Sequence, residues 1–354
     1  MNARDARRNE GSGRLRVGLM GAGRVARRFH LPILSSLPGI DLVAIADPAA
    51  DARDACRTFA PRAAFHADFA GMLASTLLDA VVICLPPALH SRAAVASFAQ
   101  GLHVYVEKPL ATSAGEGREA LDAWRRAGTV GMVGFNSRFH PLALAMKQAL
   151  ACGRVGEVTT IRSTFCATHR ALPDWKRERD QGGGALLDLA SHQVDLVRFL
   201  VGAEVVEVSA LVRSVHSEVD TAVAALRLSS GSLVSLCTSL AAVEEDRLEF
   251  NGSRGQLVLD RYRSSRLQET PARRDFRLPA RLGSALEILG RMPRTLRDAA
   301  FPPREPTFAH ALGAFVAAIR GRRPAAPDLD DGMASLAVVL AAERSAREGI
   351  VVAP

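Results

Sequence analysis

Lysine is nearly absent from this chain of 354 residues, which has only Lys108, Lys147 and Lys176 among its 45 basic residues. Most of this scarcity reflects a compositional bias toward arginine. It still singles out each remaining lysine, because a guanidinium stays protonated whereas a buried ammonium can shift its pKa and serve in proton chemistry. Lys108, at the end of a strand-like run, is the best candidate for such a role.

Aromatic residues make up only 5% of the chain. With so few rings and no nucleic-acid-binding motif, the sequence does not favour nucleic-acid binding, despite a pI of about 9.9. The positive charge is concentrated in residues 261–304, which contain eleven arginines and four acidic residues. The charge is therefore a property of one segment rather than of the whole chain.

The sequence also lacks paired cysteines and long apolar runs. Its five cysteines show no C-x-x-C spacing, so we expect reduced, mostly buried thiols. No run approaches the roughly 20 apolar residues of a membrane-spanning helix. Residues 1–16 contain Arg7 and Arg8 but no apolar stretch typical of a secretory or twin-arginine signal. The expected location is the cytoplasm, with no integral membrane segment.

What is present is a glycine-rich turn at residues 17–26, VGLMGAGRVA. Gly21 and Gly23 let the backbone turn tightly and approach a pyrophosphate, which would lie at the positive end of a helix that begins near Arg24. Ala26 is small enough to keep this helix close to the preceding strand. The turn therefore predicts a dinucleotide site, with Arg24 and Val25 among the cofactor contacts.

An acidic residue, Asp47, ends the next apolar run at residues 42–46. A carboxylate at about this distance from the glycines accepts a hydrogen bond from a ribose 2′-hydroxyl and repels a 2′-phosphate. The spacing therefore favours NAD, with NADP the less favoured cofactor.

Strand-like runs alternate with segments of helical length in the first part of the chain, which predicts a doubly wound parallel sheet of the Rossmann type. These runs lie at residues 14–20, 40–46, 80–85, 103–106 and 130–135. We assign residues 1–137 to this dinucleotide-binding domain. Residues 138–354 would form a substrate-binding and oligomerisation domain of α+β type.

After residue 138 the strand-like runs become longer and β-branched, which predicts an open, mostly antiparallel sheet. These runs lie at residues 156–168, 203–212, 220–228 and 232–243, and Ala-rich helices are expected at 311–319 and 334–342. In the run at 220–228 one face is apolar, formed by Ala222, Ala224, Leu226 and Leu228, but Val223 and Ala225 make the other face apolar too. A second apolar face favours a homo-oligomer, either a dimer or a tetramer.

Three more local sequences follow the glycine-rich turn in order: VICLPPALH at 82–90, EKP at 107–109 and GGGALLDLASHQVD at 182–195. Together with residues 134–141, 155–158 and 342–349, they resemble the Gfo/Idh/MocA family of NAD(P)-dependent sugar and polyol oxidoreductases. The resemblance covers residues 14–260 and 307–352. It implies a dehydrogenase or reductase acting on CH–OH groups.

The residue chemistry agrees with the resemblance. Pro86 ends one strand and Lys108 ends the next at the carboxyl edge of the sheet, where ligands of open α/β folds bind, and Pro109 restricts the backbone of Lys108. Asp188 and His192 lie four residues apart, so a helix would present both from one face. Such a pair suits proton transfer near neutral pH.

By resemblance, His192 is the general acid or base, Lys108 donates a hydrogen bond to the reacting oxygen, and Asp188 supports both. The expected reaction transfers a hydride between NAD and a secondary alcohol or ketone of a sugar, cyclitol or nucleotide-sugar. A metal site built from Asp188, His192 and Asp195 is not favoured, because no further ligand cluster accompanies them.

The remaining predicted contacts fall into two sets. The cofactor set is Gly21, Gly23, Arg24, Val25, Asp47, Pro86, His90, Glu107 and Lys108. The substrate set is Asn136, Arg138, Trp175 and Asp195. Plainer interpretations stay open: Asn136, Arg138 or His90 could cap a turn, Asp195 could pair with Arg198, and Trp175 could fill a local core.

Two features depart from the family pattern. Leu85 occupies a position where a hydroxylated residue is common, so a cofactor hydrogen bond is either missing or made by backbone. The basic segment 261–306 matches no part of the family pattern. It could cover the active site, bind an anionic substrate, touch a membrane surface, mediate assembly or be a solvated insertion. Two alternative functions also stay open, a redox-neutral NAD-using glycoside hydrolase and a non-catalytic dinucleotide sensor.

Overall fold

The computed structural model describes residues 13–169, 173–272 and 306–354. The fold divides the chain into two compact units. The first unit contains residues up to Phe135 together with Asp180–Gly182 and Phe308–Leu336, and the second contains Asn136–Arg179, Gly183–Thr307 and Ala337–Pro354. The units are therefore not two consecutive stretches, because a segment near the C-terminus returns to the first unit.

The first unit is built on a six-stranded sheet in the order β3-β2-β1-β4-β5-β6, and every pair in it is parallel. Its strands are β1 (Leu15–Met20), β2 (Ile40–Ala46), β3 (Ala64–His66), β4 (Ala80–Ile83), β5 (His103–Val106) and β6 (Gly131–Val133). The Rossmann prediction is confirmed. Strand β3 was not predicted.

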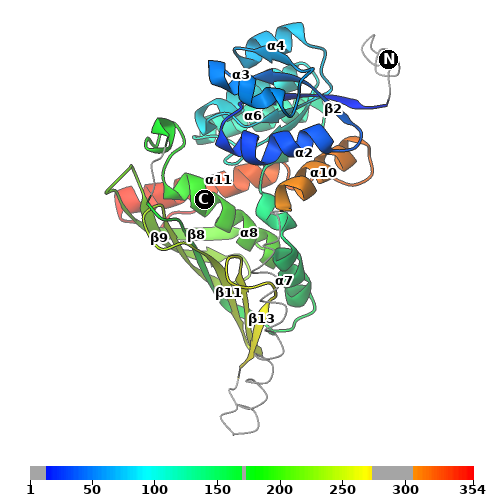
Figure 1. Cartoon of the computed structure of the whole chain (residues 1–354). Coiled ribbons are helices and arrows are strands. Elements are labelled where there is room, and N and C mark those ends of the chain that lie inside the picture. Colours follow the sequence, from blue (N-terminus) through cyan, green and yellow to red (C-terminus); the bar gives the residue numbers. More distant parts are fainter. Residues whose placement is uncertain (1–12, 170–172, 273–305) are drawn as a thin grey trace. The chain divides into compact units, whose positions relative to one another are not determined.

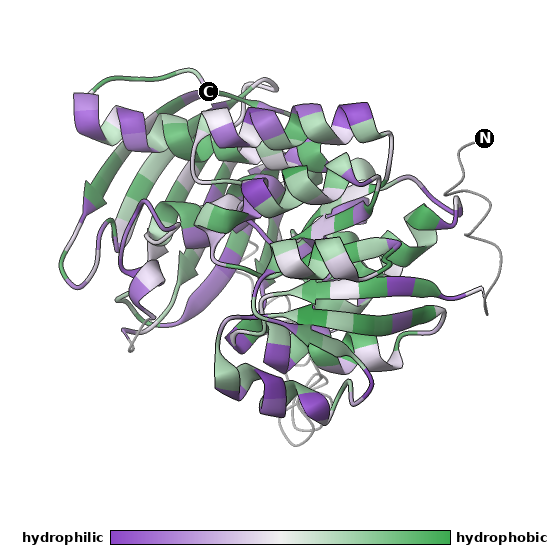
Figure 2. Ribbon diagram, turned by 90° about the horizontal axis from the view of Figure 1, so that it is seen from above, coloured by the Kyte–Doolittle hydropathy of each residue, from purple (hydrophilic) through white to green (hydrophobic). Residues whose placement is uncertain are grey.

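Helices cover both faces of this sheet (Figure 1). They are η2 (Ala26–His30), α2 (Leu31–Ser36), α3 (Ala50–Arg57), α4 (Phe69–Ser75), η3 (Pro87–Leu89), α5 (His90–Ala99) and α6 (Ala114–Ala127). Because both faces are covered, the central strands are continuously apolar, and all four residues of β4 are fully buried. Figure 2 shows hydrophobic residues along these strands.

The ends of α6 illustrate how local sequence sets the helix boundaries. Ser113 accepts a hydrogen bond from the Glu116 amide while the Glu116 side chain binds back to the N-cap backbone, which is a capping box. Gly128 ends the helix in the left-handed conformation, with φ of 62°. Both boundaries therefore result from residues within one turn of the helix ends.

The second unit contains a seven-stranded sheet in the order β13-β12-β11-β7-β10-β9-β8. Its strands are β7 (Val158–Cys166), β8 (Val205–Arg213), β9 (Thr221–Leu228), β10 (Leu233–Ser239), β11 (Glu245–Gly252), β12 (Gly255–Asp260) and β13 (Gln268–Pro271). Only the β7–β10 pair is parallel, so the prediction of a mostly antiparallel sheet is confirmed. Strands β11 to β13 were not predicted, and in β11 charged residues interrupt the apolar pattern.

Helices α7 (Pro141–Ala151) and α8 (Ser191–Val201) pack on one face of this sheet (Figure 1). Short segments η4 (Asn136–Phe139), η5 (Asp174–Lys176) and η6 (Leu186–Ala190) precede them or lie between them. Strand β9 alternates as predicted, with Ala222, Ala224, Leu226 and Leu228 buried. On the opposite face Val223 is 47% exposed and Leu211 of β8 is 72% exposed, so this face is open within the chain.

Both expected C-terminal helices form, as α10 (Thr307–Ile319) and α11 (Leu329–Glu348). The unmatched segment 261–306 is described only as far as residue 272, where β13 pairs with β12 and extends the sheet. Residues 273–305 of that segment lie outside the described part. Among the described residues, no helix combines the length and apolarity that a membrane crossing requires.

Candidate functional site

The glycine-rich turn joins β1 to the helix that begins at Arg24, as predicted. Gly21 has φ of 89°, and a Cβ there would lie 2.5 Å from the carbonyl oxygen of Cys84, so only glycine fits. A Cβ on Gly23 would meet nothing within 4 Å. The backbone at Gly23 therefore borders open space at a helix N-terminus, and this turn fits the pyrophosphate of a dinucleotide.

Asp47 follows β2 and reaches back to the same turn. Its Oδ2 accepts a hydrogen bond from the Ala22 amide at 2.7 Å, and its Oδ1 accepts one from the Ala49 amide at 2.8 Å. Asp47 is half-buried, and a contact between its carboxylate and a ribose stays a prediction. Asp47 thus has a structural role in the glycine-rich turn in addition to the predicted ribose contact.

The turns after β4 and β5 lie beside each other at the carboxyl edge of the first sheet, because β4 and β5 are paired neighbours. The His90 ring joins them: Nδ1 lies 2.7 Å from the Pro109 carbonyl oxygen, and Nε2 lies 2.8 Å from the Leu85 carbonyl oxygen. Burial lowers the pKa of His90, against the opposing effect of these two carbonyls and of Glu107. His90 is 1% exposed, and a direct cofactor contact by its ring stays a prediction.

Glu107, the residue before Lys108, is bound to the helical segment η2, which follows the glycine-rich turn. Its Oε1 lies 2.7 Å from Nε2 of the fully buried His30, and since a carboxylate only accepts, the imidazole donates. Gly134 leaves space for this carboxylate, because a Cβ there would lie 2.8 Å from Glu107 Oε2. Lys108 itself is half-buried, and its two neighbours in the chain, Glu107 and Pro109, are each held by a histidine.

In the second unit, Asp188 has a partner that the sequence analysis did not assign. Nζ of Lys176 lies 2.7 Å from Oδ2 of Asp188, with the side chains 22% and 17% exposed. The same ammonium lies 5.3 Å from the centroid of the Trp175 ring. The loop that carries these residues is anchored by Arg179, which binds both carboxylate oxygens of Glu343.

The scarcity of lysine was the signal that could have identified Lys176. The sequence analysis noted this residue only as one of the three lysines of the chain. Its ion pair with Asp188 joins residues twelve apart, which no local pattern predicts.

His192 lies in α8, directly after the π-helical segment η6 that holds Asp188. Its ring packs edge-on against Phe165, with 6.1 Å between centroids. The neighbouring Gln193 binds two residues of the sheet: Oε1 accepts from the Ser163 hydroxyl at 2.9 Å, and Nε2 donates to Asp246 at 3.1 Å. These buried contacts fix the rotation of the helix that carries His192.

Arg138 and Asp195, both predicted as substrate contacts, form a bidentate ion pair. Nε donates to Oδ2 at 2.8 Å and Nη2 donates to Oδ1 at 2.6 Å, and the side chains are 9% and 1% exposed. Asn136 donates to the Thr307 hydroxyl at 2.9 Å and is also buried. These contacts give the three residues a structural role, and their contact with substrate stays a prediction. Arg198 pairs with Glu204.

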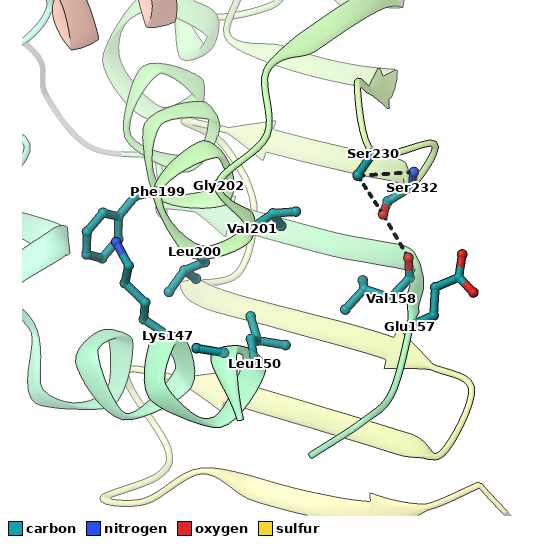
Figure 3. A pocket seen from close by; sticks show the side chains of 11 residues that line it. Lys147, Leu150, Glu157, Val158, Phe199, Leu200, Val201, Gly202, Ser230 and Ser232 are labelled. Atoms are coloured by element: carbon teal, nitrogen blue, oxygen red, sulfur yellow. Dashed lines mark hydrogen bonds between the residues drawn. The ribbon is translucent and has the colours of Figure 1, made fainter. Parts of the chain in front are cut away.

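A separate hollow of about 360 Å³ lies in the second unit, between α7, α8 and the sheet (Figure 3). Its lining includes Lys147, whose Nζ lies 3.5 Å from the centroid of the Phe199 ring, and the hydroxyls of Ser230 and Ser232. None of the predicted site residues lines this hollow. No group of three or more metal-binding side chains occurs in the described part of the chain.

A doubly wound sheet with a glycine-rich turn, joined in one chain to an open antiparallel sheet, defines a two-domain NAD-binding oxidoreductase. Family models agree: residues 15–135 match the oxidoreductase family NAD-binding Rossmann fold, and residues 143–258 match the GFO/IDH/MocA C-terminal domain. The chain belongs to the GFO/IDH/MocA family, and the resemblance seen in the sequence is confirmed.

Among similar proteins, the inositol 2-dehydrogenase of Rhizobium meliloti (strain 1021) is 28% identical over 94% of this chain and 97% of its own length. The dTDP-3,4-didehydro-2,6-dideoxy-alpha-D-glucose 3-reductase of Streptomyces violaceoruber is 31% identical over 70% of this chain and 73% of its own. The WlbA dehydrogenase of Bordetella pertussis, solved in complex with NADH and UDP-GlcNAcA, superposes with a TM-score of 0.80 at 25% identity. That match covers 96% of this chain and 99% of the WlbA chain.

The buried Arg138–Asp195 pair gives a stability prediction. Replacing Asp195 by Ala leaves a buried guanidinium without its counter-charge, so the free energy of unfolding should fall by about 3–5 kcal/mol. Thermal and urea denaturation measure the loss. The double variant Arg138→Met with Asp195→Leu removes both charges and should recover much of it. An Asp195→Ala protein that unfolds like the wild type would contradict the structural role.

Proposed function

We propose that this protein transfers a hydride between NAD and a secondary alcohol or ketone carbon of a sugar, cyclitol or nucleotide-sugar. The observation that carries the proposal is the gathering of the glycine-rich turn, Asp47 and the Lys108 turn at the carboxyl edge of one parallel sheet. Ligands of open α/β sheets bind at this edge. The names of the inositol dehydrogenase and of the nucleotide-sugar reductase support this substrate class.

In this proposal residues 1–137 form the dinucleotide-binding domain and residues 138–354 bind the substrate. Gly21, Gly23, Arg24 and Val25 hold the pyrophosphate end of the dinucleotide, and Asp47 holds its ribose. Pro86, His90 and Glu107 shape the edge near Lys108. On the substrate side, Trp175 offers an apolar ring face, as suits a sugar, while Asn136, Arg138 and Asp195 support the site.

Bound NAD supplies the hydride acceptor. His192 removes the hydroxyl proton as the alcohol becomes a ketone, and the imidazole is suited to this because it exchanges protons near neutral pH. Lys108 donates a hydrogen bond to the same oxygen and stabilises the negative charge that develops there. Asp188 orients His192, and the Lys176 ammonium at 2.7 Å balances the charge of this carboxylate.

A redox-neutral hydrolase and a non-catalytic sensor remain the alternatives. Both Lys108 and His192 are present in the chain, and this favours the oxidoreductase, since a sensor has no need of either group. We further propose a cytoplasmic enzyme that forms a homo-oligomer.

The catalytic assignment predicts the effect of two substitutions. Lys108→Met and His192→Ala should each lower kcat by about 10²- to 10⁴-fold, the usual contribution of a positioned proton-transfer group. A spectral screen of sugars, cyclitols and nucleotide-sugars for NADH formation first finds the substrate. Lys147→Met, the same change at a lysine outside the predicted site, is the matched control and should keep full activity. Full turnover by both site variants would refute the assigned roles.

The Asp47 assignment predicts cofactor preference. Asp47→Asn keeps an oxygen for the turn but loses the charge, so kcat/KM with NAD should fall about tenfold to a hundredfold while the penalty against NADP shrinks. Steady-state kinetics with both cofactors measure the change. Asp41→Asn, at the far end of β2, is the control. A wild-type enzyme that strongly prefers NADP would overturn the assignment.

The open face of the second sheet predicts assembly. Leu211→Arg and Val223→Arg place charges on this apolar face, and a charge buried without a partner is costly, so the oligomer should dissociate. Size-exclusion chromatography with light scattering gives the mass. Leu77→Arg, at an equally exposed position in the first unit, should leave the mass unchanged. A wild-type protein that runs as a monomer would disprove the oligomer.

A further inference from the structure

Lys108 lies between two residues that are each bound to a buried histidine from a different helix. Glu107, on its N-terminal side, binds His30 through its carboxylate. Pro109, on its C-terminal side, binds His90 through its carbonyl oxygen. Both histidines are almost completely buried, with 0% and 1% exposure. The backbone of Lys108 is thus held from both sides.

Aromatic rings surround the His30 side chain, and its hydrogen-bond partner is Glu107. The rings of Tyr105 and Phe308 pack edge-on against it, at centroid distances of 5.9 and 5.3 Å. Burial raises the pKa values of the Tyr105 hydroxyl and the Cys84 thiol, so both groups are neutral beside Glu107. The Glu107 carboxylate, only 13% exposed, needs a donor, and the His30 ring supplies a hydrogen bond at 2.7 Å.

The position of His30 in the fold gives this bond a second consequence. His30 ends η2, the segment that follows the glycine-rich turn, and Gly23 binds the start of that helix through the Arg27 amide at 2.9 Å. The bond to Glu107 therefore links the dinucleotide turn to the end of β5. The two regions are 77 residues apart in the chain.

His90 holds the other side by bridging two turns. One ring nitrogen faces the Pro109 carbonyl and the other faces the Leu85 carbonyl, so the ring sets the separation of the turns after β4 and β5. His90 is also the first residue of α5, whose neighbouring Ser91 donates to the Glu116 carbonyl at 2.6 Å. The ring is thus carried by a helix that is itself bonded to α6.

We propose that His30 and His90 are positioning residues that together hold the Lys108 ammonium at one place on the edge of the sheet. The inference rests on the proposed function, in which Lys108 acts on the reacting oxygen. Neither histidine touches reacting atoms in this account. Their effect is geometric, and a misplacement of about 1 Å in a catalytic group can cost about 100-fold in rate.

Histidine variants with and without a donor test the proposal. His30→Leu and His90→Leu remove the bonds and should lower kcat by about 10- to 100-fold. For His30→Leu, the affinity for NADH, measured by fluorescence titration, should stay within about threefold, since the glycines, Asp47 and the other predicted cofactor contacts are untouched. His30→Gln and His90→Gln keep N–H donors and should recover part of kcat.

His103→Leu is the matched control, because His103 begins the same strand, β5, at its opposite end, where Nδ1 accepts from the Val130 amide. It should keep kcat. In a Lys108→Met background the leucine variants should cause no further loss, since the group that they position is gone. Equal losses with and without Lys108, or a fall in NADH affinity that follows the thermal transition temperature, would show that the histidines only stabilise the fold.

A second readout needs no substrate. The chain has only three lysines, so labelling with an amine-reactive reagent followed by mass spectrometry reports each of them separately. The leucine variants should change the labelling rate of Lys108 several-fold and leave Lys147 and Lys176 unchanged. An unchanged Lys108 rate would overturn the inference even if the proposed oxidoreductase reaction holds. A changed rate in a protein that turns over no sugar or polyol would support the inference and contradict the proposed function.

Discussion

The close packing of two backbone turns is the constraint on which the candidate cofactor site depends. The turn after β1 and the turn after β4 approach so closely that a single Cβ on Gly21 would lie 2.5 Å from the Cys84 carbonyl oxygen. The Cys84 amide binds the Met20 carbonyl at 2.7 Å, and the Gly21 amide binds the Ala46 carbonyl at 2.8 Å. The ends of β1, β2 and β4 are thus fixed together by backbone alone, so their geometry does not depend on the rotamer of any side chain.

Contacts made by side chains then connect further strand ends to these backbone turns. Asp47 connects the glycine-rich turn to the end of β2, and His90 connects the turn after β4 to the turn after β5. Leu85 takes part through its carbonyl oxygen, which lies 2.8 Å from Nε2 of the His90 ring. Each link joins neighbouring strands of one parallel sheet, and together they place the groups of the cofactor edge.

The sequence was sufficient to predict the parts of this site that depend on local geometry. The glycine-rich turn, the acidic residue after β2 and the alternation of β9 all follow from requirements that act within a few residues. Bonds between distant residues do not: His30 and Glu107 are 77 residues apart, and Arg138 and Asp195 are 57 apart. Their pairing depends on which elements the fold brings together, and a polar residue alone does not identify its partner.

Local irregularity also limited the prediction. Asp188 and His192 were placed on one face by assuming a regular helix, but Asp188 lies in the π-helical segment η6, where hydrogen bonds join residues five apart and each turn holds more residues. The helix after the glycine-rich turn contains a similar segment, η2, which ends at His30. Both irregular segments follow glycine-rich sequences and carry residues of the candidate site. Periodicity alone therefore places the region, while the direction of each side chain needs the coordinates.

The three lysines of the chain make different contacts from its arginines. Arginines form the bidentate pairs of the second unit, as Arg138 does with Asp195 and Arg179 with Glu343, where a planar fork matches a carboxylate. Lys176 instead binds one oxygen of Asp188, and Lys147 lies over the face of Phe199. A compact ammonium on a flexible stem suits such single-point contacts. In the proposed function Lys108 is a third single-point contact, an ammonium that reaches one oxygen, and the proposed role of the two buried histidines is to hold its backbone.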